Sequence, residues 1–226
     1  MSPGRLLFTA GYLLVWPALV LFLAGDWTWP EGWIFGGWFV AVGASTVAWL
    51  SRRDPGLLAE RYRLPGTGGQ SRRDRIIVYV LTVGFIIWIA LMPLDARRFH
   101  WTPRLPLAVE LVGDALLALS WLLLFRSFAG NTFGSALVRV QSERGHRVVS
   151  TGVYGWVRHP MYLGATLMFV GGPLVTGAIS ALVVGLALAV LLAVRSLDEE
   201  ALLARELPGY AEYRRRVRYR LVPFVW

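Results

Sequence analysis

Cysteine and lysine are absent from this sequence, and histidine occurs only three times. Without cysteine the chain forms no disulfide, binds no zinc through thiolates, uses no thiol nucleophile and carries no prenyl or palmitoyl anchor. Without lysine, all 23 basic residues are arginine, and the net charge is +9. The arginines cluster beside apolar runs. This placement favours anionic lipid head groups over nucleic acid as their partner.

Charged residues are also scarce, at 16% of the 226 residues, whereas 56% are hydrophobic. Soluble domains have about 45–50% apolar residues, and a membrane-spanning helix needs about 20 in succession. The composition therefore predicts an all-α, polytopic membrane helical bundle, folded as a single domain over residues 1–226.

Apolar runs predict six membrane helices, of which the last two form a C-terminal helical hairpin. They cover Leu6–Leu23, Ile34–Leu50, Ile76–Met92, Leu105–Phe125, 161–172 and 174–194. The first lacks a small-x-small cleavage site, so we expect an uncleaved helix rather than a signal peptide. The last two come from one long run that Gly171-Gly172-Pro173 is expected to interrupt, leaving the fifth helix short.

The arginine distribution predicts the orientation in the membrane. Seven arginines lie in Arg52–Arg75, which places this loop in the cytoplasm by the positive-inside rule. With six spans, Arg5 and the arginine-rich tail Arg195–Trp226 then lie on the same side. Between the fourth and fifth spans, 126–159 forms the main cytoplasmic segment, with a short extended piece expected at Val138–Val140.

Two acidic residues, Glu110 and Asp114, lie inside the fourth predicted span, four positions apart and therefore on one helical face. Acidic groups are costly in a membrane and often mark a functional site. The simpler interpretation is that Glu110 lies near the interface and Asp114 hydrogen-bonds within the bundle.

A dense polar stretch, His146–Gly164, separates the apolar runs, with the sequence HRVVSTGVYGWVRHPMYLG. It holds two of the three histidines beside arginine, tyrosine and tryptophan. Its glycines and Pro160 prevent a long helix and let backbone approach a ligand. These groups favour a small-molecule site. The alternative is a loop whose arginines only bind lipid phosphates.

This stretch resembles the isoprenylcysteine carboxyl methyltransferase family. Its His-x-Leu/Val-Val, Ser/Thr-Gly-x-Tyr and Arg-His-Pro-x-Tyr-x-Gly elements are matched by His146–Val149, Thr151–Tyr154 and Arg158–Gly164. A second block matches at Arg195, Glu199-Glu200, Tyr210, Tyr213 and Arg214–Arg216. The resemblance extends from about Gln141 to Pro223. It implies an integral membrane enzyme that uses S-adenosylmethionine, with residues 126–226 as the catalytic region and 1–125 as supporting membrane helices.

The resemblance also assigns roles to single residues. Cofactor contacts fall on Gln141, His146, Arg147, Val148, Val149, Tyr154, His159, Pro160, Met161, Tyr162 and Glu199, and the acceptor carboxylate on Arg195; no metal is implied. Arginine suits a carboxylate, and Glu199, one turn further along a helix, can accept from ribose hydroxyls or an ammonium group. Alternatively, Ser196 and Glu199 form a helix capping box, and Arg195 only reaches toward lipid phosphates.

The tail is expected to form an amphipathic helix that starts after Pro208-Gly209 and carries Tyr210 and Tyr213. Its default interpretation is a surface that binds anionic lipid, and a lid over the cofactor is the alternative.

The favoured function is methyl transfer to a lipophilic acceptor, most simply a carboxylate, with amines of phospholipids and thiols as alternatives. A membrane sterol-type reductase using NADPH has a similar Pro-x-Tyr-x-Gly motif, but an acidic residue commonly follows that glycine, where this chain has Ala165. A lipid-binding or transport protein is a third interpretation, although few polar groups line the other spans. We expect a multi-pass protein of a bacterial plasma membrane, with a cytoplasmic site, lipophilic or lipid substrates and no obligate protein partner.

Overall fold

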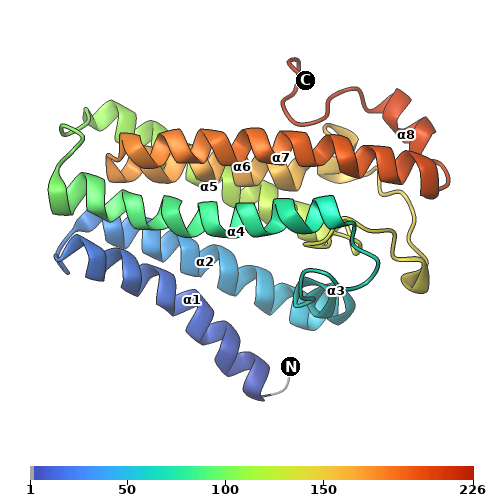
Figure 1. Ribbon diagram of the computed structural model, residues 1–226, viewed down its shortest axis with the longest axis horizontal. Coiled ribbons are helices and arrows are strands. Elements are labelled where there is room, and N and C mark those ends of the chain that lie inside the picture. The colour runs from blue at the N-terminus through green and yellow to red at the C-terminus, as the bar shows by residue number, and fades with distance from the viewer. Residues whose placement is uncertain (1–2) are drawn as a thin grey trace.

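The computed structural model describes residues 3–226, apart from the side chains of Pro3, Arg5 and Leu6. The described chain is a bundle of long helices (Figure 1). The helices are α1 (Pro3–Ala24), α2 (Pro30–Arg53), α3 (Pro55–Arg61), α4 (Arg72–Pro93), α5 (Leu107–Gly130), α6 (Pro160–Thr176), α7 (Ile179–Glu206) and α8 (Tyr210–Arg216). A π-helical turn (Leu94–Phe99) extends α4, and two 3-10 turns (Ser142–Arg144 and Gly152–Gly155) lie between α5 and α6. The predicted side of Arg5 falls outside the described residues.

The predicted all-α membrane architecture is confirmed. Five of the described helices, α1, α2, α4, α5 and α7, are long and apolar enough to cross a membrane, and α6 is a shorter apolar helix. Residues 3–226 contain no β-strand, and their one isolated bridge pairs Val157 with Tyr219. The expected extended piece at Val138–Val140 is therefore irregular backbone rather than a strand.

The boundary between the last two membrane helices is not where the sequence predicted it. Gly171, Gly172 and Pro173 lie inside α6, and the chain turns at Gly177, whose φ of +76° suits glycine. Pro173 has no N–H for the carbonyl oxygen of Phe169, four residues earlier, and Trp88 Nε1 donates to that oxygen instead, at 3.2 Å. The proline is tolerated because a neighbouring helix supplies the missing hydrogen bond.

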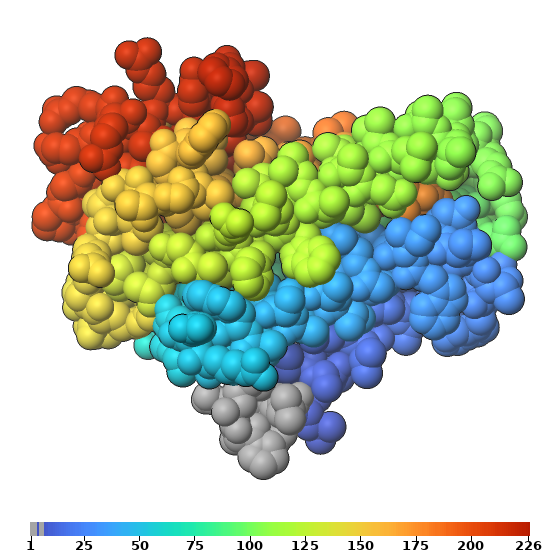
Figure 2. Space-filling model, turned by 180° about the vertical axis from the view of Figure 1, so that it is seen from behind, coloured from blue at the N-terminus to red at the C-terminus, as the bar shows by residue number. Residues whose placement is uncertain are grey.

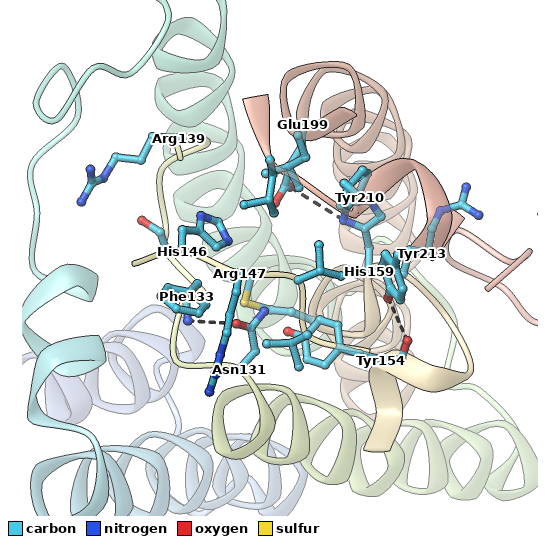
Figure 3. Close-up of a pocket in the computed structure, with 18 of the residues that line it drawn as sticks. Asn131, Phe133, Arg139, His146, Arg147, Tyr154, His159, Glu199, Tyr210 and Tyr213 are labelled. Carbon is cyan, nitrogen blue, oxygen red and sulfur yellow. Dashed lines mark hydrogen bonds and ion pairs between the residues drawn. The ribbon is translucent and has the colours of Figure 1, made fainter. Parts of the chain in front are cut away.

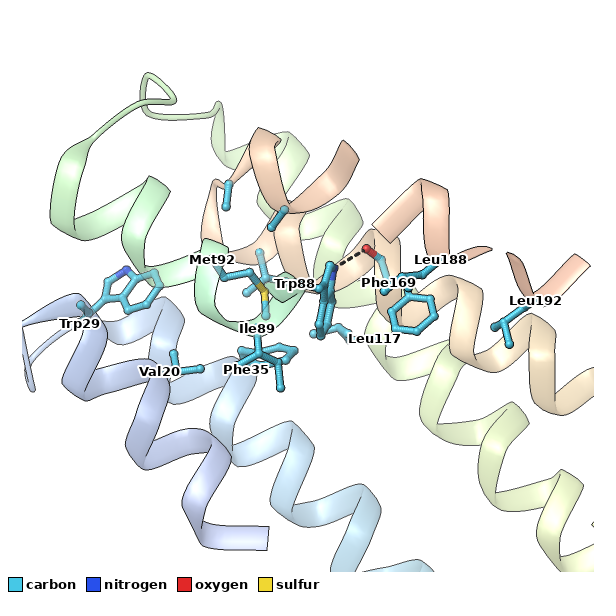
Figure 4. Close-up of a cluster of buried hydrophobic side chains, with 14 of the residues drawn as sticks. Val20, Trp29, Phe35, Trp88, Ile89, Met92, Leu117, Phe169, Leu188 and Leu192 are labelled. Carbon is cyan, nitrogen blue, oxygen red and sulfur yellow. Dashed lines mark hydrogen bonds between the residues drawn. The ribbon is translucent and has the colours of Figure 1, made fainter. Parts of the chain in front are cut away.

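The glycines of α6 serve close helix packing. A Cβ on Gly171 would lie 3.0 Å from the carbonyl oxygen of Gly113 in α5, so the two helices approach through small residues. On the other side of α6, Gly185 of α7 faces the Phe169 backbone with even less room. The apolar core is centred on Trp88 of α4, which packs against Phe35 and Phe169 (Figure 4).

The structure places α7 across the whole bundle, from Ile179 to Glu206, beyond the predicted end at residue 194. Arg195 and Glu199 therefore lie on one continuous helix, as their spacing predicted. Ser196 is mid-helix, and its hydroxyl donates to the carbonyl oxygen of Ala193 at 2.7 Å. The capping-box alternative for Ser196 and Glu199 is therefore wrong.

The tail folds back onto the polar stretch. Arg158 N donates to the Tyr219 carbonyl oxygen and His159 N to that of Arg220, both at 2.9 Å. Figure 2 shows the C-terminal segment beside the segment that follows α5, at one end of the molecule. Helix α8 begins directly after Pro208-Gly209, as predicted.

The default interpretation of α8 as a lipid-facing surface is wrong for its apolar face. Tyr210, Tyr213 and Val217 are buried and pack with Leu207 in a separate hydrophobic cluster. The apolar face is satisfied within the protein, and α8 exposes the arginines at 214–216 instead.

Candidate functional site

A cavity opens at the end of the bundle where α7 and α8 meet the segment between α5 and α6 (Figure 3). Its empty space is about 740 Å³ including the open mouth. It is lined by Asn131, Phe133, Gly134, Ser135, Leu137, Arg139, His146, Arg147, Val148, Val149, Tyr154, Arg158, His159, Met161, Tyr162, Glu199, Leu203, Leu207, Tyr210 and Tyr213.

Most of the predicted cofactor residues share this one cavity. The lining includes His146, Arg147, Val148, Val149, Tyr154, His159, Met161, Tyr162 and Glu199. Gln141 and Pro160 do not line it. The Gln141 side chain is fully buried, donating to the Phe133 carbonyl oxygen and accepting from Arg144. A cofactor role for Gln141 or Pro160 stays a prediction from the resemblance.

His146 forms one wall of the cavity. Its ring stacks on Phe133 at 4.5 Å between centroids, and its Nδ1 accepts from the backbone N of Gln141 at 3.2 Å. Burial lowers the pKa of His146 below its ordinary value of 6.5. The ring is thus neutral near pH 7, with its proton on Nε2, which leaves that nitrogen as a donor.

Glu199 presents a negative charge to the cavity from α7. Its Oε2 accepts from the Tyr162 hydroxyl at 2.7 Å and lies 3.7 Å from His159 Nδ1, while the His159 and Tyr162 rings stack at 5.3 Å. The Glu199 side chain is 27% exposed and forms no ion pair with an arginine within residues 3–226. Its charge is therefore available to a ligand.

The next residue, Glu200, has the opposite situation. Its buried carboxylate accepts from Arg158 Nε at 2.7 Å, Arg220 Nη2 at 3.1 Å and His159 Nε2 at 3.2 Å. Arg158 also donates to the carbonyl oxygens of Val217 and Arg218, both at 2.7 Å. Glu200 and Arg158 thus fix the tail against His159, and through it they position one wall of the cavity.

Three tyrosines close the cavity from the other side. Burial raises the pKa of Tyr154 to about 12, and Tyr213 donates to the Tyr154 carbonyl oxygen at 2.8 Å. Tyr210 lies beside Tyr213, with ring centroids 5.6 Å apart. The sequence showed these two tyrosines as a pair spaced for one helical face, but not which way that face would turn.

Several lining residues carry no usable sequence signal. Asn131, Phe133, Ser135 and Leu137 belong to the irregular segment after α5, where no periodicity predicts orientation. The guanidinium of Arg139 points away from the other labelled side chains (Figure 3), because Glu60 binds its Nε at 2.8 Å. Arg139 therefore ties this segment to α3.

Arg195 does not line this cavity. It contributes instead to a largely apolar groove between α1, α4, α6 and α7, whose empty space is about 880 Å³ including its opening. The groove is lined by Tyr12, Trp16, Val78, Leu81, Thr82, Phe85, Ile86, Ala136, Ala165, Phe169, Leu192 and Arg195. Figure 1 shows α1 diverging from α4 toward the N-terminal end of α1.

Asp74, at the start of α4, holds the Arg195 guanidinium. Arg195 Nε donates to Asp74 Oδ1 at 2.8 Å, and Nη2 donates to Asp74 Oδ2 at 3.3 Å and to the Ala136 carbonyl oxygen at 2.7 Å. Nη1 has no hydrogen-bond partner within residues 3–226. The guanidinium also lies 5.8 Å from the Tyr162 ring centroid. Tyr162 therefore touches Glu199 of the cavity and Arg195 of the groove.

Glu110 and Asp114, the acidic pair of the fourth predicted span, line neither the cavity nor the groove. Glu110 lies in the first turn of α5, near the end of the bundle opposite the cavity, and Asp114 lies one turn further. Neither side chain forms a hydrogen bond or ion pair within residues 3–226, so the expected side-chain hydrogen bond of Asp114 in the bundle is not found.

Comparisons with known proteins match both most of the segment that forms the cavity and the fold of the bundle. Residues 115–205 match the model of the isoprenylcysteine carboxyl methyltransferase family. The fold is similar to a solved structure of the eukaryotic intramembrane Ras methyltransferase, an isoprenylcysteine carboxyl methyltransferase. The TM-score is 0.57 and the identity 20%, over 96% of this chain and 75% of that one. No curated protein matches significantly. Residues 115–205 are thus similar to this family, and the chain shares the fold of the solved methyltransferase.

Proposed function

We propose that this chain transfers a methyl group from S-adenosylmethionine to the carboxylate of a lipophilic acceptor. The observation that carries the proposal is the position of Tyr162. Its hydroxyl binds Glu199 in the polar cavity, and its ring faces Arg195 at the end of the apolar groove. A water-soluble donor and a lipid-borne acceptor would therefore meet on the two sides of one side chain.

The donor set of the cavity fits S-adenosylmethionine. Glu199 can accept from the ammonium group or the ribose hydroxyls, and the Nε2 proton of neutral His146 can be donated to an oxygen. The ring faces of Tyr154 and Tyr162 suit adenine or a sulfonium cation. When bound, the cofactor would supply the reactive methyl group on its sulfonium.

The groove fits an apolar tail that enters from the lipid. Its walls are mainly aromatic and aliphatic, and Arg195 is the arginine among them. Methyl transfer to a carboxylate breaks a carbon–sulfur bond, forms a carbon–oxygen bond and needs no general base. The protein has to hold the carboxylate, align it and exclude water. Arg195, fixed by Asp74, can offer Nη1 to the acceptor without rotating.

The same proposal specifies where the acceptor comes from and which side of the membrane the cavity faces. The acceptor is a lipid or lipophilic molecule taken from the membrane, and the cavity faces the cytoplasm, where S-adenosylmethionine is made. The arginine-rich loop before α4 lies at the cavity end of the bundle, which agrees with this orientation.

Two titrations of the purified protein, one with S-adenosylmethionine and one with NADPH, test the cofactor. Binding of the first and not the second supports a methyltransferase, and the reverse result supports the reductase alternative. A transfer assay then compares an S-prenylated N-acetylcysteine with an amine and a thiol that bear the same prenyl chain. Methylation of the amine or thiol but not the acid would refute the carboxylate acceptor.

A further inference from the structure

Arg61, the last residue of α3, contacts the wall of the cavity and lies near Arg195 of the groove. Its side chain is partly buried, with Nη1 3.4 Å from the Gly134 carbonyl oxygen and 3.7 Å from Met161 Sδ. Gly134 and Met161 both line the cavity. The guanidinium lies over the Phe128 ring, 4.6 Å from its centroid. Next to Arg61, Tyr62 hydrogen-bonds Thr9 of α1, the helix that forms one wall of the groove.

Arg61 has no acidic partner among the described residues. The well-buried arginines of the same region each have one within 2.8 Å: Arg139 has Glu60, Arg158 has Glu200, and Arg195 has Asp74. Glu60, adjacent to Arg61 in sequence, is already bound by Arg139 and by Arg63, the latter at 2.7 Å. Arg61 Nε and Nη2 donate no hydrogen bond within residues 3–226.

This arrangement leaves a positive charge without compensation. A carbonyl oxygen at 3.4 Å and a thioether at 3.7 Å are weak partners for a guanidinium, and a buried charge without a counter-ion is costly. Burial and the nearby Arg195 guanidinium lower the pKa of Arg61 from its usual value. Two like charges close together favour an anion between them.

We propose that Arg61 supplies the cation that binds the acceptor carboxylate, opposite Arg195. The inference rests on the proposed function and makes it more specific. Asp74 already neutralises Arg195, so Arg195 contributes orientation through Nη1 but little net charge. Arg61 brings the uncompensated charge. Together they favour an acid over an amine, because a cationic acceptor would be repelled by Arg61.

The surroundings of Arg61 include residues of both spaces. Tyr12 and Arg195 of the groove and Tyr154 and Tyr162 of the cavity all lie near enough to influence its charge. The acidic group of the cavity, Glu199, lies on the far side of Tyr162 and binds its hydroxyl. An anion held by Arg61 would thus lie on the acceptor's path.

The test measures binding of N-acetyl-S-farnesylcysteine and of its uncharged methyl ester to the purified full-length chain, without turnover. The wild type should prefer the acid. Arg61→Met, which keeps much of the side-chain volume, should lose about tenfold or more in affinity for the acid, with little change for the ester. Arg61→Lys should retain part of the preference. Arg63→Met is the matched control, because Arg63 is more exposed and is paired with Glu60.

Three outcomes would overturn the proposal. An unchanged preference for the acid in Arg61→Met would make Arg61 a lipid anchor or a structural residue. A parallel loss of S-adenosylmethionine affinity in Arg61→Met would assign Arg61 to the cofactor. An equal loss in Arg63→Met would indicate only a general effect of charge. Binding of the acid is measured without the cofactor. Failure of wild-type methyl transfer would therefore refute the proposed function, while the binding test of Arg61 would still give a clear answer.

Discussion

Neighbouring carboxylates in α7 have different surroundings, and the difference separates a ligand-binding role from a structural one. Glu199 faces the cavity and binds Tyr162, whereas Glu200 is 2% exposed and surrounded by Arg158, Arg220 and His159. A buried carboxylate that has lost its charge leaves its cations unpaired, which is expensive. When a carboxylate at a cavity wall is replaced, water can solvate the groups that it contacted, so the loss of stability is small.

We therefore expect Glu199→Gln and Glu200→Gln to differ. Glu199→Gln should weaken S-adenosylmethionine binding by about ten- to a hundredfold and leave thermal stability close to wild type. Glu200→Gln should lower the melting temperature and expose the tail to protease. Calorimetric titration and thermal unfolding in detergent measure the two effects. Equal losses of stability in both variants would contradict this division of roles.

The pair of Asp74 and Arg195 links residues 121 positions apart in the sequence. Asp74 Oδ2 also accepts from Gln70 Nε2 at 2.6 Å and from Val138 N at 3.1 Å, so the carboxylate is itself fixed. A guanidinium held at two nitrogens keeps a defined orientation, which a lysine ammonium cannot reproduce.

Arg195→Lys should therefore recover little of the methyl transfer lost in Arg195→Ala, and both variants should retain nearly normal S-adenosylmethionine affinity. Asp74→Asn should lower kcat with a smaller effect on cofactor binding, because the Arg195 guanidinium loses its charged partner. Transfer to the prenylated acid and cofactor titration measure these effects. Near-normal turnover in Arg195→Lys would show that orientation of the guanidinium does not matter.

The lowered pKa of His146 has a consequence for stability against pH. Well above pH 6.5, the histidine is neutral in both the folded and the unfolded chain, and it makes no pH-dependent contribution to stability. As the pH falls below 6.5, the unfolded chain binds a proton that the folded chain resists, so stability decreases. The decrease stops once the pH is below the folded pKa.

His146→Gln lacks this titrating group. Between pH 7.5 and 5.5, its melting temperature should fall less than that of the wild type, and the difference should develop below about pH 6.5. Thermal unfolding across this pH range checks the prediction. Parallel curves would mean that His146 is solvated enough to titrate normally.

At the scale of helices, the sequence predicted which segments are helical but not where α6 ends. Long apolar runs require helix in a membrane, so existence and order follow from composition. The break depends on Trp88, whose indole N–H replaces the hydrogen bond that Pro173 removes. No local rule connects a tryptophan and a proline on different helices, so Gly171-Gly172-Pro173 predicts an interruption of the helix that the structure does not have.

Close packing of α6 on α7 leads to a prediction about Gly185. A Cβ at this position would lie 2.2 Å from the Phe169 carbonyl oxygen and 3.0 Å from Trp88 Nε1, so Gly185→Ala forces α6 and α7 apart. We expect a loss of about 1–3 kcal/mol in unfolding free energy, seen as a lower melting temperature. Gly37→Ala is the control, because nothing lies within 4 Å of a Cβ there. An unchanged melting temperature in Gly185→Ala would show that the interface yields easily.

The site was predictable to the extent that its residues are close in sequence or share a helix face. His146, His159 and Tyr162 belong to one motif, and Arg195 and Glu199 are one turn apart, so a cavity near the end of α7 was a reasonable expectation. Asp74 and Arg61 come from segments far from that motif. Their contribution depends on how α3 and the start of α4 pack, which periodicity does not encode.

At the scale of the whole molecule, the two ends of the bundle have different polar architecture. The cavity end contains α3, α8 and the loop before α4 (Figure 1). At the other end, Asp95 is fully buried and accepts from the backbone N and hydroxyl of both Thr102 and Ser180, at 2.6–3.0 Å. These hydrogen bonds tie the π-helical turn after α4 to the start of α7. The hydrogen bonds of Asp95 thus brace the end of the bundle opposite the cavity.

The arginine bias predicts that the cavity end faces the cytoplasm, and the absence of cysteine makes this testable in intact cells. Thr67 and Pro103 are exposed, at the cavity end and the opposite end respectively. Thr67→Cys is preferable to a change at Gln70, because Gln70 Nε2 donates to Asp74 at 2.6 Å. A membrane-impermeant maleimide added outside should label Pro103→Cys, and should label Thr67→Cys only after the cells are permeabilised. Labelling of Thr67→Cys in intact cells would reverse the orientation. The cavity would then open away from the cytoplasmic supply of S-adenosylmethionine, so this one result bears on the topology and on the proposed chemistry together.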